Sequence, residues 1–211
     1  MFKHGTIALG LLMPDDTALR ETADALEIAE QAGEPIAIGS ALLARGITLV
    51  YRDGLESEAG YALLDEVRAM ALDHQFSLVI VPIVDLHTAR RKAELKAFDE
   101  AIELARAALD NLTASGEMIW RGMATSTLVE SLLLRGADGD IAQAHAAIER
   151  LTAVPTDPGF VLHELPLLRM RALVARAQGI DDTYQQYRDR YRKMATDLGF
   201  QGHLKWAEAM P

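Results

Sequence analysis

Apolar side chains recur along this chain at steps of three and four residues, which places them on one face of a helix. One such stripe contains Phe98, Ile102, Ala105, Leu109 and Leu112. A second, richer in aromatic rings, contains Tyr184, Tyr187, Tyr191, Met194 and Leu198. Charged residues fill the opposite faces, as at Glu100, Glu103 and Arg106. The pattern predicts amphipathic helices that bury their apolar stripes against one another.

Helix-breaking positions interrupt this pattern at intervals of about 20 to 22 residues. They are Gly33, Gly54, the surroundings of His74 and of Glu94, Gly116, residues 136–139, residues 155–159, Gly179 and Gly199. One helix and a short turn fill each interval, so two intervals make a hairpin of about 42 residues. A repeated residue pair supports this period: the six-residue spacing of Phe76 and Pro82 recurs at Phe160 and Pro166, 84 residues later.

An isolated hairpin cannot bury both of its faces, so neighbouring hairpins must stack. We therefore predict an all-α, tetratricopeptide-like, right-handed solenoid of about five antiparallel hairpins, or roughly ten helices. We expect a single repeat domain over residues 1–211. The apolar start of the chain lacks a polar cap, which favours a fragment of a longer multidomain protein. An uncovered solenoid end would also allow a homodimer.

Start and stop residues agree with these helices. Asp15 and the aspartate after it are expected to cap a helix that begins near Thr17, and Pro35 suits the first turn of the next. Asp181 and Asp182 are expected to cap the helix that carries the three tyrosines. Five glycines stand where a left-handed C-terminal cap would lie: Gly33, Gly54, Gly116, Gly179 and Gly199.

The segment 76–84 is open to two interpretations, because its β-branched residues also suit a buried strand. Pro82 argues against a central strand, since proline lacks the donor that a ladder needs. A lone strand among helices would also have no partner. We predict a helix with Pro82 in its first turn or two, and the same position for Pro166 in a later helix.

Composition narrows the possible functions. The chain has 211 residues, half of them hydrophobic, a formal net charge of −10 and no cysteine. The negative charge argues against nucleic-acid binding, and the missing thiols exclude disulfides and thiolate metal sites. No apolar run reaches the roughly 20 residues of a membrane span, and Pro14 stands where a signal peptide would need small residues. We expect a cytoplasmic protein without a membrane partner.

Sequence motifs of catalysis are missing. The chain has no phosphate loop, dinucleotide fingerprint, His-Glu-x-x-His zinc motif or nucleophile elbow. We therefore expect no enzyme, no cofactor and no metal. Asp85 and His87 form the most enzyme-like pair, but two residues of separation place them on different sides of a helix. A cryptic helical enzyme is accordingly the weakest of the hypotheses.

Two basic clusters are candidates for binding. The denser one contains His87, Arg90, Arg91, Lys92 and Lys96. It suits either a solvated helix end or an anion or acidic-peptide contact in a groove. Trp120 is either a core filler or a ligand platform. The candidate groove contacts are His87, Arg90, Arg91 and Trp120. The second basic cluster, residues 188–193, fits the outer face of the tyrosine helix or a docking helix.

Several motifs in the second half of the chain carry a family resemblance. They are LRGADGDI at 134–141, AIERL at 147–151, the segment 187–203 with its Tyr187, Tyr191, Leu198, Gly199 and Gly202, and WAEAM at 206–210. They resemble the C-terminal helical-repeat region of large mycobacterial signalling proteins. In that family a class III adenylate/guanylate cyclase domain, or a related regulator, precedes an NTPase module and tetratricopeptide-like repeats.

The resemblance implies a module of such a protein and not its enzyme. The cyclase's metal-binding aspartates and the NTPase's phosphate loop have no matching positions here, and neither does the LuxR-type DNA-binding helix-turn-helix of relatives. The leading hypothesis is a non-catalytic module for protein–protein interaction or regulation, whose partner is a protein or peptide, including the parent's own cyclase or NTPase domains. The alternative is a small-molecule-sensing domain that controls an attached NTPase or transcriptional output, with His87, Arg91 and Trp120 as contacts.

Overall fold

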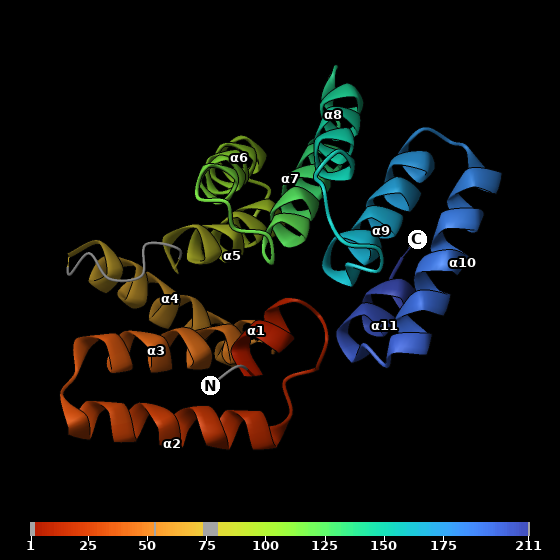
Figure 1. Cartoon of the computed structure of the whole chain (residues 1–211). Helices are drawn as coiled ribbons and strands as arrows, with labels where there is room; N and C mark the ends of the chain where they lie inside the picture. The colour runs from red at the N-terminus through yellow and green to blue at the C-terminus, as the bar shows by residue number, and fades with distance from the viewer. Residues whose placement is uncertain (1–2, 53, 74–79, 211) are drawn as a thin grey trace. The chain divides into compact units, whose positions relative to one another are not determined.

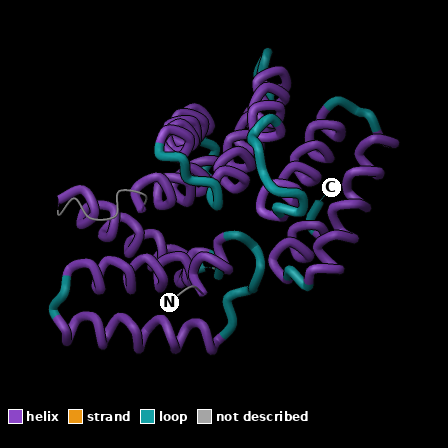
Figure 2. The backbone as a smooth tube through the Cα atoms, viewed as in Figure 1, coloured by secondary structure: helices purple, strands orange, loops and turns teal. Residues whose placement is uncertain are grey.

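The computed structural model describes residues 3–52, 54–73 and 80–210. These residues form eleven α-helices joined by short loops, and Figure 2 shows no strand in the part of the chain that is described. Neighbouring helices pack as pairs, which confirms the predicted all-α helical-repeat fold. The number of helices is close to the roughly ten that the spacing of the breakers predicts.

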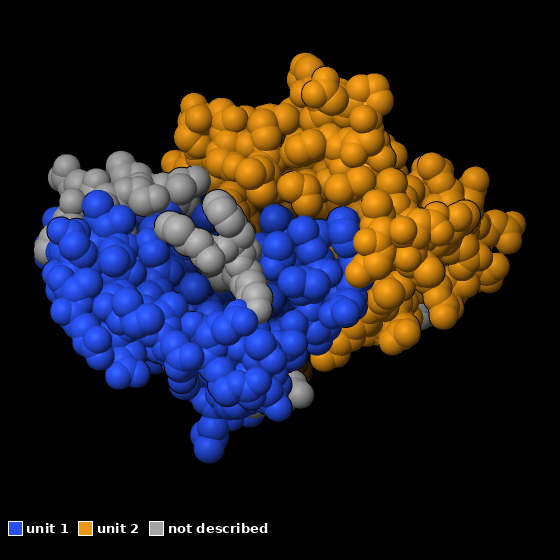
Figure 3. Space-filling view, turned by 60° about the horizontal axis from the view of Figure 1, so that its bottom comes forward, with its two compact units in different colours: residues 1–84, 200–202 blue, residues 85–199, 203–211 orange. Residues whose placement is uncertain are grey.

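The chain divides into two compact units, drawn in different colours in Figure 3. Unit 1 comprises residues 1–84 and 200–202, and unit 2 comprises residues 85–199 and 203–211. Unit 1 contains α1 (Lys3–Ala8), α2 (Asp16–Ala32), α3 (Pro35–Val50), α4 (Leu55–Asp73) and the start of α5 (Ile80–Glu94). Unit 2 contains the rest of α5, α6 (Phe98–Ala114), α7 (Arg121–Arg135), α8 (Asp140–Thr152), α9 (Val161–Ala177), α10 (Asp181–Leu198) and most of α11 (Gln201–Glu208). That residues 1–211 form a single domain stays a prediction. Two compact units belong to one domain if they unfold together in one cooperative transition.

Successive helices lie side by side within each unit. In unit 1, α3 packs against α1, α2 and α4, and in unit 2 each helix from α6 to α10 packs against the next (Figure 1). Helix α7 also contacts α9, so alternate helices touch as they do in stacked hairpins. The tyrosine stripe of α10 faces this packing, since Tyr184 and Tyr191 are buried. Among the described helices, none combines the length and apolar character that a membrane crossing requires.

Most of the predicted helix ends are confirmed. Asp15 caps α2 by accepting the backbone N–H of Ala18 at 2.7 Å, and Pro35 is the first residue of α3. All five predicted glycines have left-handed φ angles, and four of them lie at or directly after the C-cap of a helix: Gly33, Gly116, Gly179 and Gly199. The predicted capping by Gly54 is wrong, because α3 already ends at Val50 and Gly54 directly precedes α4. The predicted capping of α10 by its two aspartates is wrong. The Ile180 N–H bonds back to the carbonyl of Ala175 and makes Ile180 the N-cap, so both aspartates lie in the first turn.

Both prolines lie near the starts of helices, as the sequence predicts. Pro82 is in the first turn of α5, and Pro166 is in the second turn of α9, while residues 76–79 lie outside the described part. Pro166 has no N–H to donate to the carbonyl of Leu162, four residues earlier. Gly122 of α7 approaches that carbonyl so closely that a Cβ at this position would lie 2.1 Å from its oxygen. The proline and the glycine together bring α7 and α9 into backbone contact.

Unit 1 uses glycines for the same purpose. A Cβ at Gly60 of α4 would lie 2.7 Å from the Val50 nitrogen and 2.8 Å from the Gly46 carbonyl oxygen of α3. A Cβ at Gly202 would lie 2.7 Å from the Cα of Gly10, and the N–H of the residue before Gly202 donates to the Leu11 carbonyl at 3.2 Å. Helices α3 and α4, and the two chain segments at Gly10 and Gly202, are therefore packed backbone to backbone.

Candidate functional site

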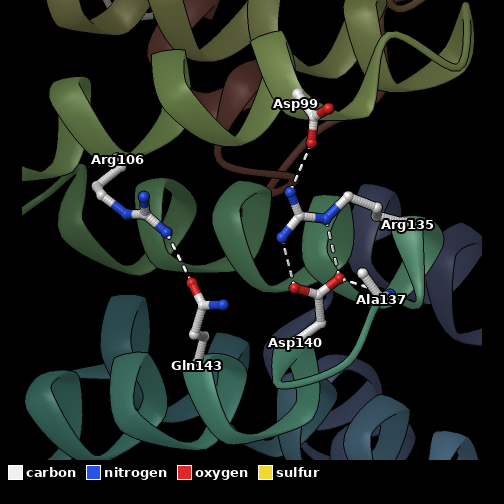
Figure 4. A network of polar contacts seen from close by, with 6 residues as sticks. All are labelled: Asp99, Arg106, Arg135, Ala137, Asp140 and Gln143. Atoms are coloured by element: carbon white, nitrogen blue, oxygen red, sulfur yellow. Dashed lines mark hydrogen bonds and ion pairs between the residues drawn. The ribbon is translucent and has the colours of Figure 1, made fainter.

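Arg135, at the end of α7, fastens that helix to the start of α8. Its Nε and Nη2 donate to the two carboxylate oxygens of Asp140 at 3.0 and 2.6 Å, and its Nη1 donates to Asp99 at 2.6 Å (Figure 4). The backbone N–H of Ala137 donates to Asp140 at 2.8 Å. The hydrogen bonds from Arg135, then that of Ala137 and the charge of Arg135, hold the pKa of Asp140 below its usual value against the effect of burial.

This network accounts for the LRGADGDI motif at residues 134–141. Gly136 and Gly139 both have left-handed φ angles, 64° and 87°, which close the turn between the two helices. Beside the turn, Arg106 of α6 donates to Gln143 of α8 at 2.9 Å, which adds a second polar contact across the layer (Figure 4). In this structure the motif is a hairpin connection, and two of its charged residues, Arg135 and Asp140, bind each other.

A second set of polar and aromatic side chains spans alternate helices of unit 2. We call it the polar row, and its members are Arg90 of α5, Glu130 of α7, Arg169 of α9 and Trp206 of α11. Successive members lie 40, 39 and 37 residues apart, close to the hairpin period, so each repeat supplies one of them. All four are partly exposed. The polar row is therefore a repeat-built feature that solvent can reach.

An ion pair joins the two middle members of the polar row. Both terminal nitrogens of Arg169 donate to the carboxylate of Glu130, with Nη2 at 2.9 Å from Oε2. Burial alone would raise the pKa of Glu130, but the charge and hydrogen bonds of Arg169, with the charge of Arg90, lower it. Glu130 is accordingly ionised, and its side chain remains 34% exposed. Two cations and one anion leave this part of the row with a net positive charge.

Trp206 joins the last helix to this ion pair. The guanidinium carbons of Arg90 and Arg169 each lie 5.8 Å from the centroid of its ring, within the range of cation–π attraction. The ring of His203 meets Trp206 edge-on, with centroids 4.8 Å apart. His203 Nδ1 shares a hydrogen bond of 2.7 Å with the hydroxyl of Tyr191, whose pKa is raised by burial. Helix α11 is thus held to α5, α9 and α10 by polar contacts of its aromatic rings.

The structure places two of the predicted groove residues together, and they belong to α5. Arg90 is a member of the polar row, and His87 lies one turn before it. His87 is 1% exposed, and burial, followed by the charge of Arg90, lowers its pKa to about 3. It is therefore a neutral core histidine at physiological pH, and Asp85 on the same helix is buried as well.

The other two predicted groove residues, Arg91 and Trp120, are not members of the polar row. Arg91 forms an ion pair with Glu94 of its own helix, with 3.6 Å between Nη1 and Oε2. Trp120 is the N-cap of α7, where its backbone N–H donates to Glu117 at 2.8 Å. Arg90 therefore pairs with the indole of Trp206 in place of that of Trp120.

Sequence reasoning missed Glu130, Arg169 and the partnership of Arg90 with Trp206. Glu130 and Arg169 each lie alone on a mainly apolar helix face, so neither belongs to a charge cluster. The signal that could have found them was the repeat period, which we applied to glycines, prolines and apolar residues but not to charges. A charge that recurs every 40 residues on the buried side of a helix indicates a shared polar contact.

The chain matches no protein-family model, no curated protein and no solved structure. Among the residues that the structure describes, no three His, Asp or Glu side chains gather in the way a metal site would need. What the polar row offers chemically is therefore charge, hydrogen bonding and an aromatic surface.

Proposed function

We propose that this chain is a non-catalytic helical-repeat module for protein–protein interaction or regulation. The observation that carries the proposal is the polar row. Helices α5, α7 and α9 and the last helix, α11, each contribute one partly exposed side chain at nearly constant sequence spacing. The contacts of Arg169 with Glu130 and of Trp206 with Arg90 and Arg169 join these side chains into a surface of mixed charge and aromatic character. Helical-repeat proteins commonly bind peptides or neighbouring domains through surfaces that successive repeats build in this way.

The nature of the partner follows from the resemblance of the second half of the chain. We propose that the partners are domains of a cyclase/NTPase-type bacterial signalling protein, including the parent of this module. The positive charge that Arg90 adds beside the Arg169–Glu130 pair supports an acidic contact on the partner. Because these features serve recognition, regulation would act through binding and not through chemistry in this chain.

The test is a calorimetric titration of the chain with separately produced cyclase and NTPase domains of that family. Arg90→Glu reverses a charge in the polar row, and Arg192→Glu makes the same change on the exposed side of α10 as a matched control. We expect a protein partner to bind the wild-type chain and to bind Arg90→Glu at least tenfold more weakly, with Arg192→Glu unchanged. Circular dichroism of both variants checks that the fold is kept. The proposal is wrong if no domain binds, or if both variants lose affinity equally.

A further inference from the structure

The last helix meets its neighbours through a regular set of anchor residues. They are His203, Trp206 and Ala207 of α11 and Met210 two residues beyond its end, and their sequence spacing corresponds to positions i, i+3, i+4 and i+7. His203 and Ala207 are buried, and the other two are partly buried. This spacing is the one by which an amphipathic helix lies in a groove of another protein.

Each end of this anchor set has its own partners. His203 contacts Tyr191 of α10, and the Trp206 ring lies within 5.8 Å of the guanidinium carbons of both Arg90 and Arg169. Met210 packs against the cluster of Ala172, Ala175 and Tyr184, formed by α9 and α10. The receiving surface is therefore built by three helices, α5, α9 and α10, which we call the α11 groove.

From His203 onward, helix α11 depends on this groove for its shape, whereas its first two residues contact Leu11 and Gly10. It spans only eight residues, Gln201–Glu208, and isolated helices shorter than about 12 residues are marginal in water. Gly199, with its left-handed φ of 68°, separates it from α10. A short helix that follows a glycine turn and is held by side-chain anchors has the properties of a bound peptide ligand that is tethered to its receptor.

We propose that the α11 groove is a binding site for an amphipathic helix and that α11 occupies it in cis as an exchangeable ligand. The partner helix carries the same anchors: a hydrogen-bonding ring at the first position, an indole at the second, and aliphatic side chains at the third and fourth. The indole is the specific element, because its ring makes cation–π contacts with the guanidiniums of both Arg90 and Arg169. This inference rests on the proposed function, since it names the kind of partner that the module binds.

The tether makes α11 a strong competitor. A segment joined to its site by a short linker acts at an effective concentration on the order of millimolar, so a free helix with the same anchors binds the intact chain weakly. Weakening the anchors of α11 leaves the groove open for a larger fraction of the time. The apparent affinity of a free helix should then rise in proportion to that fraction.

The experiment uses a fluorescein-labelled synthetic peptide with the sequence of residues 200–210, titrated with the full chain and followed by fluorescence anisotropy. We expect the peptide to bind the Trp206→Ala chain with a Kd at least tenfold lower than that for the wild-type chain. A control peptide with alanine in place of its tryptophan should bind neither chain. Equal affinity of the first peptide for both chains, or no binding to a folded Trp206→Ala chain, would overturn the proposal.

A second variant keeps this test decisive. Met210→Ala removes an anchor outside the polar row, so it should open the groove to a smaller degree if Trp206→Ala does not fold. Peptide binding also requires no natural partner. Its failure therefore contradicts the α11 groove alone, whereas a chain that binds the peptide but no protein domain contradicts the proposed interaction function.

Discussion

The α3–α4 contact of unit 1 and several helix contacts of unit 2 are closed in different ways. In unit 1, α3 and α4 meet at Gly46 and Gly60, where backbone lies against backbone and no charge takes part. In unit 2, the pairs Arg135–Asp140 and Arg169–Glu130 and the Tyr191–His203 hydrogen bond join helices through polar groups. One backbone contact of the first kind also occurs in unit 2, at Gly122. A helix pair can thus be closed by shape, as at the α3–α4 contact, or by paired charges, as between Arg169 and Glu130, and the paired charges respond to pH.

Among the variants that test this comparison, Tyr191→Ala in unit 2 should lower the free energy of unfolding the most. Tyr191 is fully buried and shares a hydrogen bond with His203 Nδ1, so its removal leaves a cavity and breaks that hydrogen bond. We expect a loss of about 3 to 5 kcal/mol in the free energy of unfolding, measured by urea denaturation. Tyr187→Ala, on the same helix but only partly buried, is the control and should cost less than half as much. A loss under about 1 kcal/mol for Tyr191→Ala would mean that this ring does not support unit 2.

Gly60→Ala tests the contact that closes unit 1. In an open helix this change stabilises by about 1 kcal/mol, but here the new methyl group meets the backbone of α3. We expect a loss of about 2 kcal/mol instead, with the same value at low and high salt because no charge is involved. Ala62→Val adds bulk on the exposed side of the same helix and should change stability by less than about 0.5 kcal/mol. A stabilising Gly60→Ala would show that the two helices are farther apart.

Asp140→Ala tests the Arg135–Asp140 ion pair of unit 2 through the pH dependence of stability. Because the pKa of Asp140 is lowered in the folded state, its contribution is complete above the ordinary value of 3.8 and is lost as pH falls through the folded-state pKa. At neutral pH the variant should be less stable than the wild type by about 2 kcal/mol, and this difference should shrink in acid. The exposed Asp138→Ala, in the same turn, is the control. A difference that does not change with pH would contradict the ionic role.

The smallest effect should come from Lys96→Gly, in unit 2. Lys96 is the one non-glycine residue with positive φ, 63°, among those that the structure describes. It closes α5 through its N–H to Ala93, while the next N–H bonds to Lys92. Glycine adopts this conformation without a steric penalty, so we expect a gain of about 0.5 to 1 kcal/mol in thermal or urea unfolding. Glu94→Gly, within the helix, should instead destabilise by about 1 kcal/mol.

The sequence predicted the helices well because their signals are local. The apolar stripe of α10, the cap at Asp15 and the position of Pro166 all depend on residues within a few turns. The capping of α10 was missed because the turn at Ile180, and not the aspartate side chains, satisfies the first backbone groups. The contacts of Trp206 with Arg90 and Arg169 could not be predicted, since they join residues 116 and 37 positions apart and depend on how hairpins stack.

The contact between Gly10 and Gly202 has a consequence for the synthesis of the chain. Nascent proteins generally fold from the N-terminal side as they leave the ribosome. Unit 1 cannot follow that order to completion, because residues 200–202 belong to it and are translated long after its helices. The Gly10–Gly202 contact can form only after residues 85–199 of unit 2 have been translated, so a ribosome that stalls before codon 200 would release a chain that lacks this contact of unit 1.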